Sequence, residues 1–253
     1  MISKVIDKII YFYKKKNYQI EKFEKEQNNT FIKIKLDRLE GKKKLEEIKR
    51  EYQFLEREMS SEHEVLFSSI SLKSDLTIEN ILEIGTFDGA NAFLLSKLFE
   101  KSKIETIDLD KNSEDFKNIY NRKEKLFEFI ENRDKLLSKS KNINFKEMNS
   151  LKLVDIEKKY DLIWIDGAHG YPVVCIDIIN SLNLIKKGGY ILVDDIYTNR
   201  INSDRMYSSN AGYETLNELK KAKIIDFSLI YKRLDEKNNC YPKKRKFIAL
   251  IKY

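Results

Sequence analysis

Short apolar runs, each followed by a turn or an acidic residue, recur through the middle of the chain and alternate with helix-like segments. The five runs lie at residues 81–84, 104–107, 143–145, 162–165 and 190–193. A strand that is buried on both faces reads as a continuous apolar run, and the helices that connect parallel strands fall between such runs. The pattern therefore predicts an α/β fold built on a mostly parallel sheet.

The ends of the chain predict further elements. Residues 224–231 and 246–253 read as two final strands. Residues 1–26 have the spacing of an amphipathic helix, which Asn28-Asn29 is expected to break. Residues 31–36 fit either a short strand or the head of the next helix.

A helix that starts near Lys42 carries one narrow apolar seam. The seam is too short for an independent coiled coil, so it either docks on the main domain or pairs with a second subunit. We therefore expect a helical appendage at residues 1–60, serving docking or homodimerisation, and a main domain at residues 61–253. The seam consists of Leu45, Ile48, Tyr52, Leu55 and Met59.

Two helix boundaries are also predicted. Ser61-x-x-Glu64 has the form of a capping box that opens a helix, and His63 beside it is expected to be a surface or capping residue. A helix over residues 173–185 is expected to stop at Gly188-Gly189.

Composition limits the functional class. The 253 residues are 42% hydrophobic, and no apolar run approaches the roughly 18 residues that span a membrane. Cys175 and Cys240 form no disulfide or zinc pattern, so we expect a reduced, cytoplasmic protein. The net charge of +7 indicates a solvated surface or attraction of an acidic small molecule. Because no RNA-binding signature accompanies it, we expect neither a nucleic-acid nor a membrane partner.

Three aspartates follow predicted strands. Asp166 ends the run at 162–165, and Asp194 and Asp195 end the run at 190–193. The carboxyl ends of parallel strands meet at one edge of a sheet, so these carboxylates should lie together. Such mutual repulsion is usually tolerated for a divalent cation or for an acid/base task. The alternative is that Asp194-Asp195 only caps a helix.

The turn Gly85-Thr-Phe-Asp-Gly89 is built for a different ligand. It lacks the glycine pattern of dinucleotide binders, although it lets the backbone pass close beneath a ligand. Asp108 closes the next strand, where a carboxylate can accept both hydroxyls of a ribose. A ribose without a pyrophosphate cradle suggests S-adenosylmethionine as the cofactor.

Residues 81–195 resemble a class I S-adenosylmethionine-dependent methyltransferase. The segments ILEIGTFDGANAFLLSKLF, YDLIWIDGAHGY and KKGGYILVDDIY resemble its metal-dependent O-methyltransferase branch, close to the macrocin O-methyltransferases and cephalosporin-hydroxylase-like proteins. The resemblance implies a Rossmann-like, seven-stranded, mostly parallel sheet with an antiparallel C-terminal strand. Residues 1–60 match nothing in this family.

The resemblance also implies roles for individual residues. The methionine end of the cofactor would lie against Glu83, Gly85, Thr86 and Gly89, the ribose against Asp108, and the adenine near Asn149 and Ser150. Asp166 would border the cofactor and, with Asp194 and Asp195, would bind a divalent cation, most simply Mg²⁺. Asn149 departs from the more frequent aspartate at its position.

The expected reaction is methyl transfer to an oxygen of a small polar acceptor, with metal assistance. Asp166 or His169 would take the acceptor's proton, although His169 could instead only hydrogen-bond a loop. The acceptor would be a sugar or a polysaccharide or secondary-metabolite precursor, including phosphorylated ones. Its specificity would lie in the appendage and in the loop at residues 197–210. The alternatives are a metal-independent N- or RNA methyltransferase and a catalytically silent partner subunit.

Overall fold

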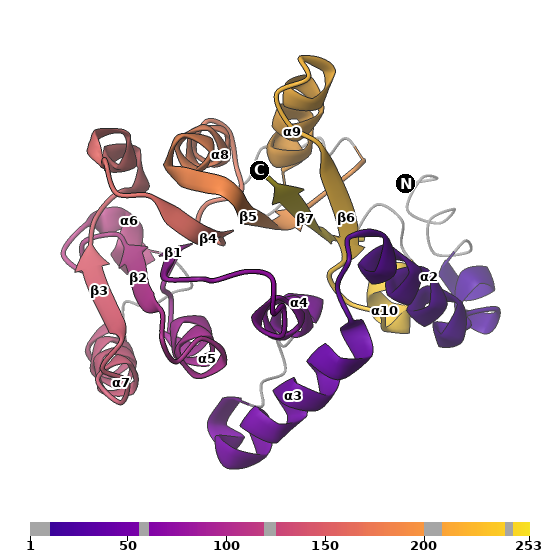
Figure 1. Cartoon of the computed structure of the whole chain (residues 1–253), viewed down its shortest axis with the longest axis horizontal. Helices are drawn as coiled ribbons and strands as arrows, with labels where there is room; N and C mark the ends of the chain where they lie inside the picture. The colour runs from indigo at the N-terminus through magenta and orange to yellow at the C-terminus, as the bar shows by residue number, and fades with distance from the viewer. Residues whose placement is uncertain (1–10, 56–60, 119–124, 200–208, 241–244) are drawn as a thin grey trace.

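One seven-stranded sheet organises the chain (Figure 1). The computed structural model describes residues 11–55, 61–118, 125–199, 209–240 and 245–253. The strand order is β3-β2-β1-β4-β5-β7-β6. The strands are β1 (Asn80–Ile84), β2 (Lys103–Asp108), β3 (Ile143–Glu147), β4 (Tyr160–Ile165), β5 (Ile185–Ile196), β6 (Phe227–Tyr231) and β7 (Phe247–Lys252).

Strand direction confirms the predicted fold class. The first five strands are all parallel, and β7 pairs antiparallel with both β5 and β6. Because β7 is reversed between its neighbours, the end of β6 and the start of β7 lie at the same edge as the end of β5. This edge carries the candidate site.

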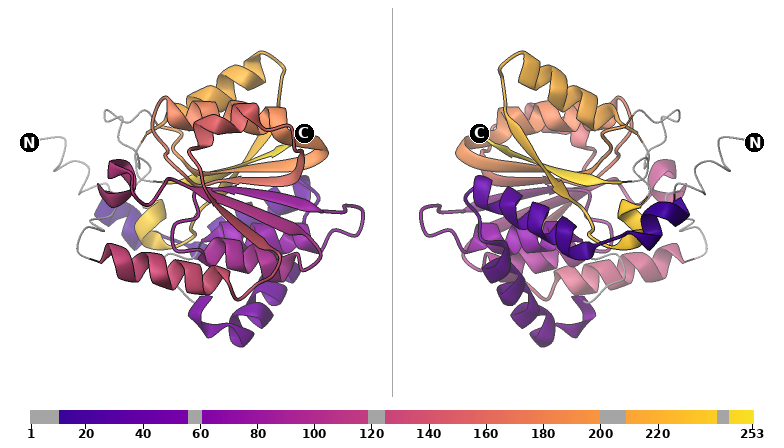
Figure 2. Two further views of the ribbon diagram at one scale, coloured as in Figure 1. Left: turned by 90° about the vertical axis from the view of Figure 1, so that its left-hand side faces the viewer. Right: turned by 90° about the vertical axis from the view of Figure 1, so that its right-hand side faces the viewer.

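Helices cover both faces of the sheet, as the edge-on views in Figure 2 show. One face is covered by α4 (Glu62–Ser71), α5 (Ala90–Leu98) and α7 (Leu126–Leu137), and the other by η3 (Ser150–Asp155), α8 (Val173–Leu184) and α9 (Ala211–Lys221). Side chains alternate accordingly along β4: Leu162 and Trp164 enter the first core, and Ile163 and Ile165 enter the second. Two short helices, α6 (Glu114–Asn118) and α10 (Glu236–Asn239), lie in connections.

The N-terminal segment is helical but differs in its boundaries. Helix α2 runs over Ile20–Lys33, so the predicted break at Asn28-Asn29 is wrong; within the described residues, the chain leaves the helix at residues 17–19. The helix continues because Gln27 and Phe31 on one face are buried against the rest of the protein. Residues 31–36 are the end of this helix and a turn, not a strand. Residues 1–10 lie outside the described range.

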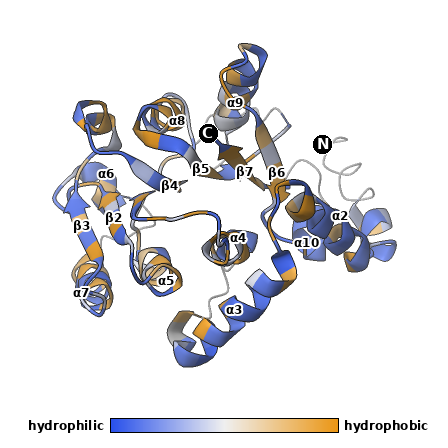
Figure 3. Cartoon of the chain, viewed as in Figure 1, coloured by the Kyte–Doolittle hydropathy of each residue, from blue (hydrophilic) through white to orange (hydrophobic). Residues whose placement is uncertain are grey.

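The apolar seam is used within the chain. Helix α3 (Arg38–Glu51) and η1 (Gln53–Leu55) place Leu45 and Leu55 in the core, and Ile48 and Tyr52 pack against it. Most of the other α3 residues are hydrophilic (Figure 3), and apart from Arg38 and Gly41 they are exposed or half-buried. Met59 lies outside the described residues. The seam therefore docks on the same chain, while the predicted homodimer stays a prediction.

Two further boundaries differ from the predictions. Helix α8 ends at Leu184 and β5 begins at once, so Gly188-Gly189 lies inside the strand and does not stop the helix. Helix α4 begins where the capping box placed it, but the Ser61 side chain makes no cap hydrogen bond and contacts His63 instead. Among the described helices, none has the length and hydrophobicity needed to cross a membrane.

Candidate active site

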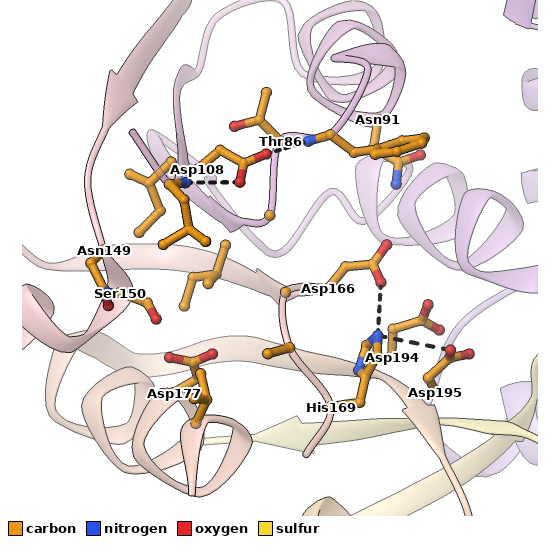
Figure 4. A pocket seen from close by; sticks show the side chains of 18 of the residues that line it. Thr86, Asn91, Asp108, Asn149, Ser150, Asp166, His169, Asp177, Asp194 and Asp195 are labelled. Atoms are coloured by element: carbon orange, nitrogen blue, oxygen red, sulfur yellow. Dashed lines mark hydrogen bonds and ion pairs between the residues drawn. The ribbon is translucent and has the colours of Figure 1, made fainter. Parts of the chain in front are cut away.

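A cavity of about 300 Å³ opens at the carboxyl edge of the parallel strands (Figure 4). Most of the predicted site residues line it, because β1, β2, β4 and β5 all end there. Glu83 and Gly89 are not among the lining residues. The predicted residues at the cavity wall are Gly85, Thr86, Asp108, Asn149, Ser150, Asp166, His169, Asp194 and Asp195.

The turn after β1 forms one wall. Gly85 has φ of +102°, and a Cβ there would lie 2.3 Å from the carbonyl oxygen of Asp166, so only glycine lets this turn pack against the end of β4. Glu83 is buried beneath the turn, where one carboxylate oxygen accepts from the Thr106 hydroxyl at 2.5 Å and the other has no hydrogen-bond partner among the described residues. Burial raises the pKa of Glu83 well above its ordinary value.

Asp108 closes the adjacent wall. Its two oxygens accept the backbone N–H groups of Phe87 at 2.9 Å and Leu109 at 2.8 Å, which fixes the carboxylate at the cavity rim. A carboxylate held at the rim of the cavity is the type of group that the sequence predicts as the acceptor of ribose hydroxyls. Asn149 has a structural task, because its side chain accepts the Leu151 N–H at 3.0 Å and caps η3.

A β-bulge near the end of β5 directs Asp194 and Asp195, on the opposite wall of the cavity, toward the same side of the strand. The register between β5 and β7 shifts between Val193 and Ile196, and Asp195 has φ of +53°. Consecutive strand residues normally point to opposite faces, whereas a bulge with a left-handed residue re-aims one of them. Asp194 and Asp195 therefore both reach the same cation.

That cation is the ammonium group of Lys232, the residue after β6. It donates hydrogen bonds to Asp194 and Asp195, and Lys246, just before β7, donates to the second oxygen of Asp195. Although burial raises the pKa of a carboxyl group, the charge of Lys232 holds the pKa values of Asp194 and Asp195 below their usual range. Burial lowers the pKa of Lys232, but the carboxylates of Asp194 and Asp195 raise it by more, so the pKa lies above its ordinary value. Lys232 is thus charged.

Asp166 and His169 form a second pair in the same cavity. His169 Nε2 lies 3.5 Å from Asp166 Oδ1 and 3.8 Å from Asp195 Oδ2. Burial and the neighbouring Asp194 raise the pKa of Asp166 to about 7. Burial lowers the pKa of His169, but Asp166 and Asp195 raise it above its ordinary value. Asp166 can therefore accept and release a proton near neutral pH.

The predicted magnesium site does not fit this arrangement. Lys232 lies between the carboxylates of Asp194 and Asp195, where a divalent ion would have to bind. Among the described residues, no group of three or more His, Cys, Asp or Glu side chains is placed to hold a metal ion. The ammonium group of Lys232 already neutralises the repulsion between the strand-end aspartates. That repulsion was the reason for inferring a metal ion.

The cavity-lining residues that the sequence reasoning missed include His63, Asn91 and Lys232. His63 was expected at the surface, but it is buried, stacks on Trp164 at 5.1 Å and lies 3.2 Å from Asn91 Oδ1. Burial lowers its pKa. Lys232 lies at this edge because β6, which it follows, pairs with the reversed strand β7. Only knowledge of this strand pairing could have revealed Lys232 as a site residue.

Comparison with known protein families gives a match to the middle of the chain. Residues 82–196 match a family model described as a methyltransferase domain. No curated protein sequence gives a significant match. The matched segment contains the turn after β1, Asp108 and the three strand-end aspartates, so it spans most of the cavity wall.

Solved structures share the fold. A putative caffeoyl-CoA O-methyltransferase from Staphylococcus aureus is 17% identical, with 82% of this chain and 91% of that chain covered and a TM-score of 0.51. Cofactor-bound Rv0187 from MTB is 16% identical, with 74% and 76% covered and a TM-score of 0.50. An O-methyltransferase from Bacillus cereus in complex with SAH is 19% identical, with 70% and 74% covered and a TM-score of 0.45.

The two structures with TM-scores of 0.50 and 0.51 confirm the Rossmann-like fold, and the family match supports the predicted methyltransferase class for residues 82–196. They do not separate the metal-dependent branch from the rest. The acceptor, the partners and the cytoplasmic location stay predictions.

Proposed function

We propose that this chain transfers a methyl group from S-adenosylmethionine to an oxygen of a small polar acceptor. The observation that carries the proposal is one cavity that joins a cofactor-type turn to a pair formed by a half-buried acid and a buried histidine. Thr86 and Asp108 lie toward its first end, and Asp166 and His169 toward its second (Figure 4). Holding donor, acceptor and base in one cavity removes the entropic cost of bringing them together.

The first end fits the proposed cofactor by the chemistry of its groups. Asp108 offers a carboxylate that backbone N–H groups hold in place, which suits a ribose diol. Glu83 has a buried carboxylate oxygen without a partner beneath the turn, which suits a nearby ammonium group. When bound, S-adenosylmethionine supplies a methyl group that is already activated by its positive sulfur.

The second end supplies the base. Asp166 is about a quarter exposed, toward the cavity, and its Oδ1 is the atom that faces His169. Its Oδ2 is then the oxygen placed to receive a proton from an acceptor hydroxyl, while His169 orients the carboxylate. A base with a pKa of about 7 is well matched to work at neutral pH.

The proposal needs no divalent ion, because Lys232 and Lys246 supply positive charge beside the acids. Metal assistance by Mg²⁺, as the sequence suggested, would require Lys232 to leave its two carboxylates. No contact in the described residues favours a nitrogen or RNA acceptor. A small sugar-type acceptor, phosphorylated or not, remains the class to test first.

The test is an acceptor screen on the full chain. Free sugars, sugar phosphates and nucleotide-linked sugars are incubated with S-adenosylmethionine, with Mg²⁺ or with EDTA, and S-adenosylhomocysteine is quantified by mass spectrometry. We expect acceptor-dependent product that EDTA does not abolish. Asp166→Asn should lower kcat by about 10²–10⁴ and leave S-adenosylhomocysteine affinity unchanged.

Asp110→Asn, at an exposed residue beyond β2, serves as the matched control and should keep full activity. The proposal is wrong if no hydroxylated acceptor yields product, or if Asp166→Asn is as active as the control.

A further inference from the structure

Lys232 is a buried lysine that the methyltransferase resemblance does not assign. Its side chain is 10% exposed, and its ammonium group lies between the carboxylates of Asp194 and Asp195 at the cavity wall. Burying a lysine costs several kcal/mol unless carboxylates compensate it closely. Such a group is retained where its charge has a task.

The surrounding structure holds Lys232 in a fixed position. Its backbone N–H donates to the Lys246 carbonyl at 3.0 Å, and its carbonyl accepts the Glu62 N–H at 2.9 Å. The preceding residue, Tyr231, exchanges two 3.0 Å hydrogen bonds with the buried amide of Gln27 on α2. Elements from both ends of the chain thus fix the tip of β6.

The ammonium group also has a donor to spare. A lysine has three N–H groups, and two of them are directed at Asp194 and Asp195. The described residues provide no partner for the third, and Lys232 lines the cavity. A polar oxygen in the cavity can accept that third hydrogen bond.

We propose that Lys232 is the resident cation of this site: it occupies the place of a divalent ion between the strand-end aspartates and donates its free N–H to the acceptor oxygen. The occupancy follows from the structure alone, whereas the contact with the acceptor rests on the proposed function. In the reaction, the acceptor hydroxyl passes its proton to Asp166 and its oxygen forms the new C–O bond. The C–S bond of the donor breaks, and the electron pair stays on a neutral sulfur.

The first experiment measures metal binding and requires no acceptor. The full chain is titrated with Mn²⁺ and bound ion is quantified by electron paramagnetic resonance, with and without S-adenosylhomocysteine. We expect no site in the wild-type protein. In Lys232→Met the freed carboxylates should bind Mn²⁺ at least about tenfold more tightly, because Asp166, Asp194 and Asp195 then lack their cation.

Lys186→Met is the matched control. Lys186 also bridges two carboxylates, 2.9 Å from Asp161 and 3.4 Å from Glu79, but it does not line the cavity. Its removal should leave Mn²⁺ affinity unchanged. If circular dichroism shows that Lys232→Met is misfolded, Lys232→Gln, whose amide can still donate, replaces it in the same titration.

Two outcomes overturn the proposal. One is a wild-type Mn²⁺ site that Asp194→Asn abolishes, and the other is a folded Lys232 variant that binds Mn²⁺ no better than Lys186→Met. With an active acceptor in hand, Lys232→Met should also move the pH–rate profile to higher pH, because the acceptor oxygen loses its positive neighbour. A wild-type protein without methyl transfer would refute the proposed function and leave the metal result standing.

Discussion

At the residue scale, the carboxylates of the cavity are satisfied in two different ways. Asp108 accepts neutral backbone donors, while Asp194 and Asp195 are bound to lysine ammonium groups. The first arrangement fixes a carboxylate at the cavity wall. The second consumes the charge within the protein. Replacement of the two kinds of aspartate should therefore affect ligand binding differently.

Asp108→Asn should weaken S-adenosylhomocysteine binding about 10- to 100-fold, because a hydrogen bond to a charged group contributes about 1.5–3 kcal/mol. Isothermal titration calorimetry measures the affinity, and circular dichroism checks that the fold is intact. Asp110→Asn, two residues on and exposed, is the control that should bind normally. Equal affinities in the two variants would remove Asp108 from the cofactor site.

Asp177→Asn tests a buried acid that the proposed reaction does not use. Burial raises the pKa of Asp177 to about 6, and Ser150 only partly opposes it. The pKa of Asp177 in the folded protein lies above the ordinary value of 3.8. The stability that protonated Asp177 contributes is therefore fully present below pH 4 and is lost as the pH rises toward 6. The asparagine variant should therefore be more stable than wild type at pH 8, by about 1–3 kcal/mol.

Urea denaturation of the two proteins without cofactor, at pH 4 and pH 8, measures this difference. The variants should be nearly equal at pH 4. A stability gap that does not change between the two pH values would mean that Asp177 is charged throughout.

At the element scale, local backbone geometry positions the site. The turn after β1 packs on the end of β4 through Gly85, and the bulge in β5 turns Asp195 toward Lys232. On the far side, Gln27 of α2 binds the edge strand β6 just before Lys232. The turn and the bulge each contribute a backbone feature that a straight strand would lack, and α2 contributes a buried side-chain amide.

Gly85→Ala should abolish cofactor binding and lower stability by about 3 kcal/mol or more, because the methyl group adds a clash to an unfavourable φ. Gly188→Ala is the matched control: its φ is +85°, but nothing lies within 4 Å of the added Cβ. It should cost only about 1–2 kcal/mol. Calorimetry with S-adenosylhomocysteine and urea denaturation measure both variants, and similar losses would mean that the clash with β4 is unimportant.

At the scale of the whole molecule, the N-terminal helices complete the core. Phe31, Leu45 and Leu55 are buried in the same cluster as the helices that cover the sheet. Arg38 is buried and binds both oxygens of Glu62 at the start of α4, at 2.7 and 2.8 Å. The predicted boundary at residue 60 thus passes through a packed, ion-paired interface.

Deletion of residues 1–60 should therefore prevent stable folding. It exposes the apolar surface beneath α2 and α3 and leaves Glu62 without Arg38, and breaking one buried ion pair alone costs about 3–5 kcal/mol. Thermal unfolding followed by circular dichroism compares residues 61–253 with the full chain. A truncated protein that unfolds cooperatively at the same temperature would show that the appendage is an independent unit.

The sequence by itself determined the elements and their order. Apolar runs and helical spacing are local patterns, and they located the strands and the carboxyl edge at which Gly85, Asp108, Asp166 and Asp194 meet. The same patterns placed most of the candidate cofactor residues, because parallel strands deliver their last residues to one edge. They failed at Asn28-Asn29, where burial of one helix face outweighs a weak helix preference.

Only the tertiary structure decided what those residues do together. Strand β7 runs between β5 and β6, and this places Lys232 and Lys246 against aspartates that precede them by dozens of positions in the chain. The bulge at Asp195 and the burial of His63 likewise depend on neighbours that are distant in sequence. Charge and burial act between residues that are close in space. The aspartates in the sequence therefore could not show that a lysine of the same chain neutralises them.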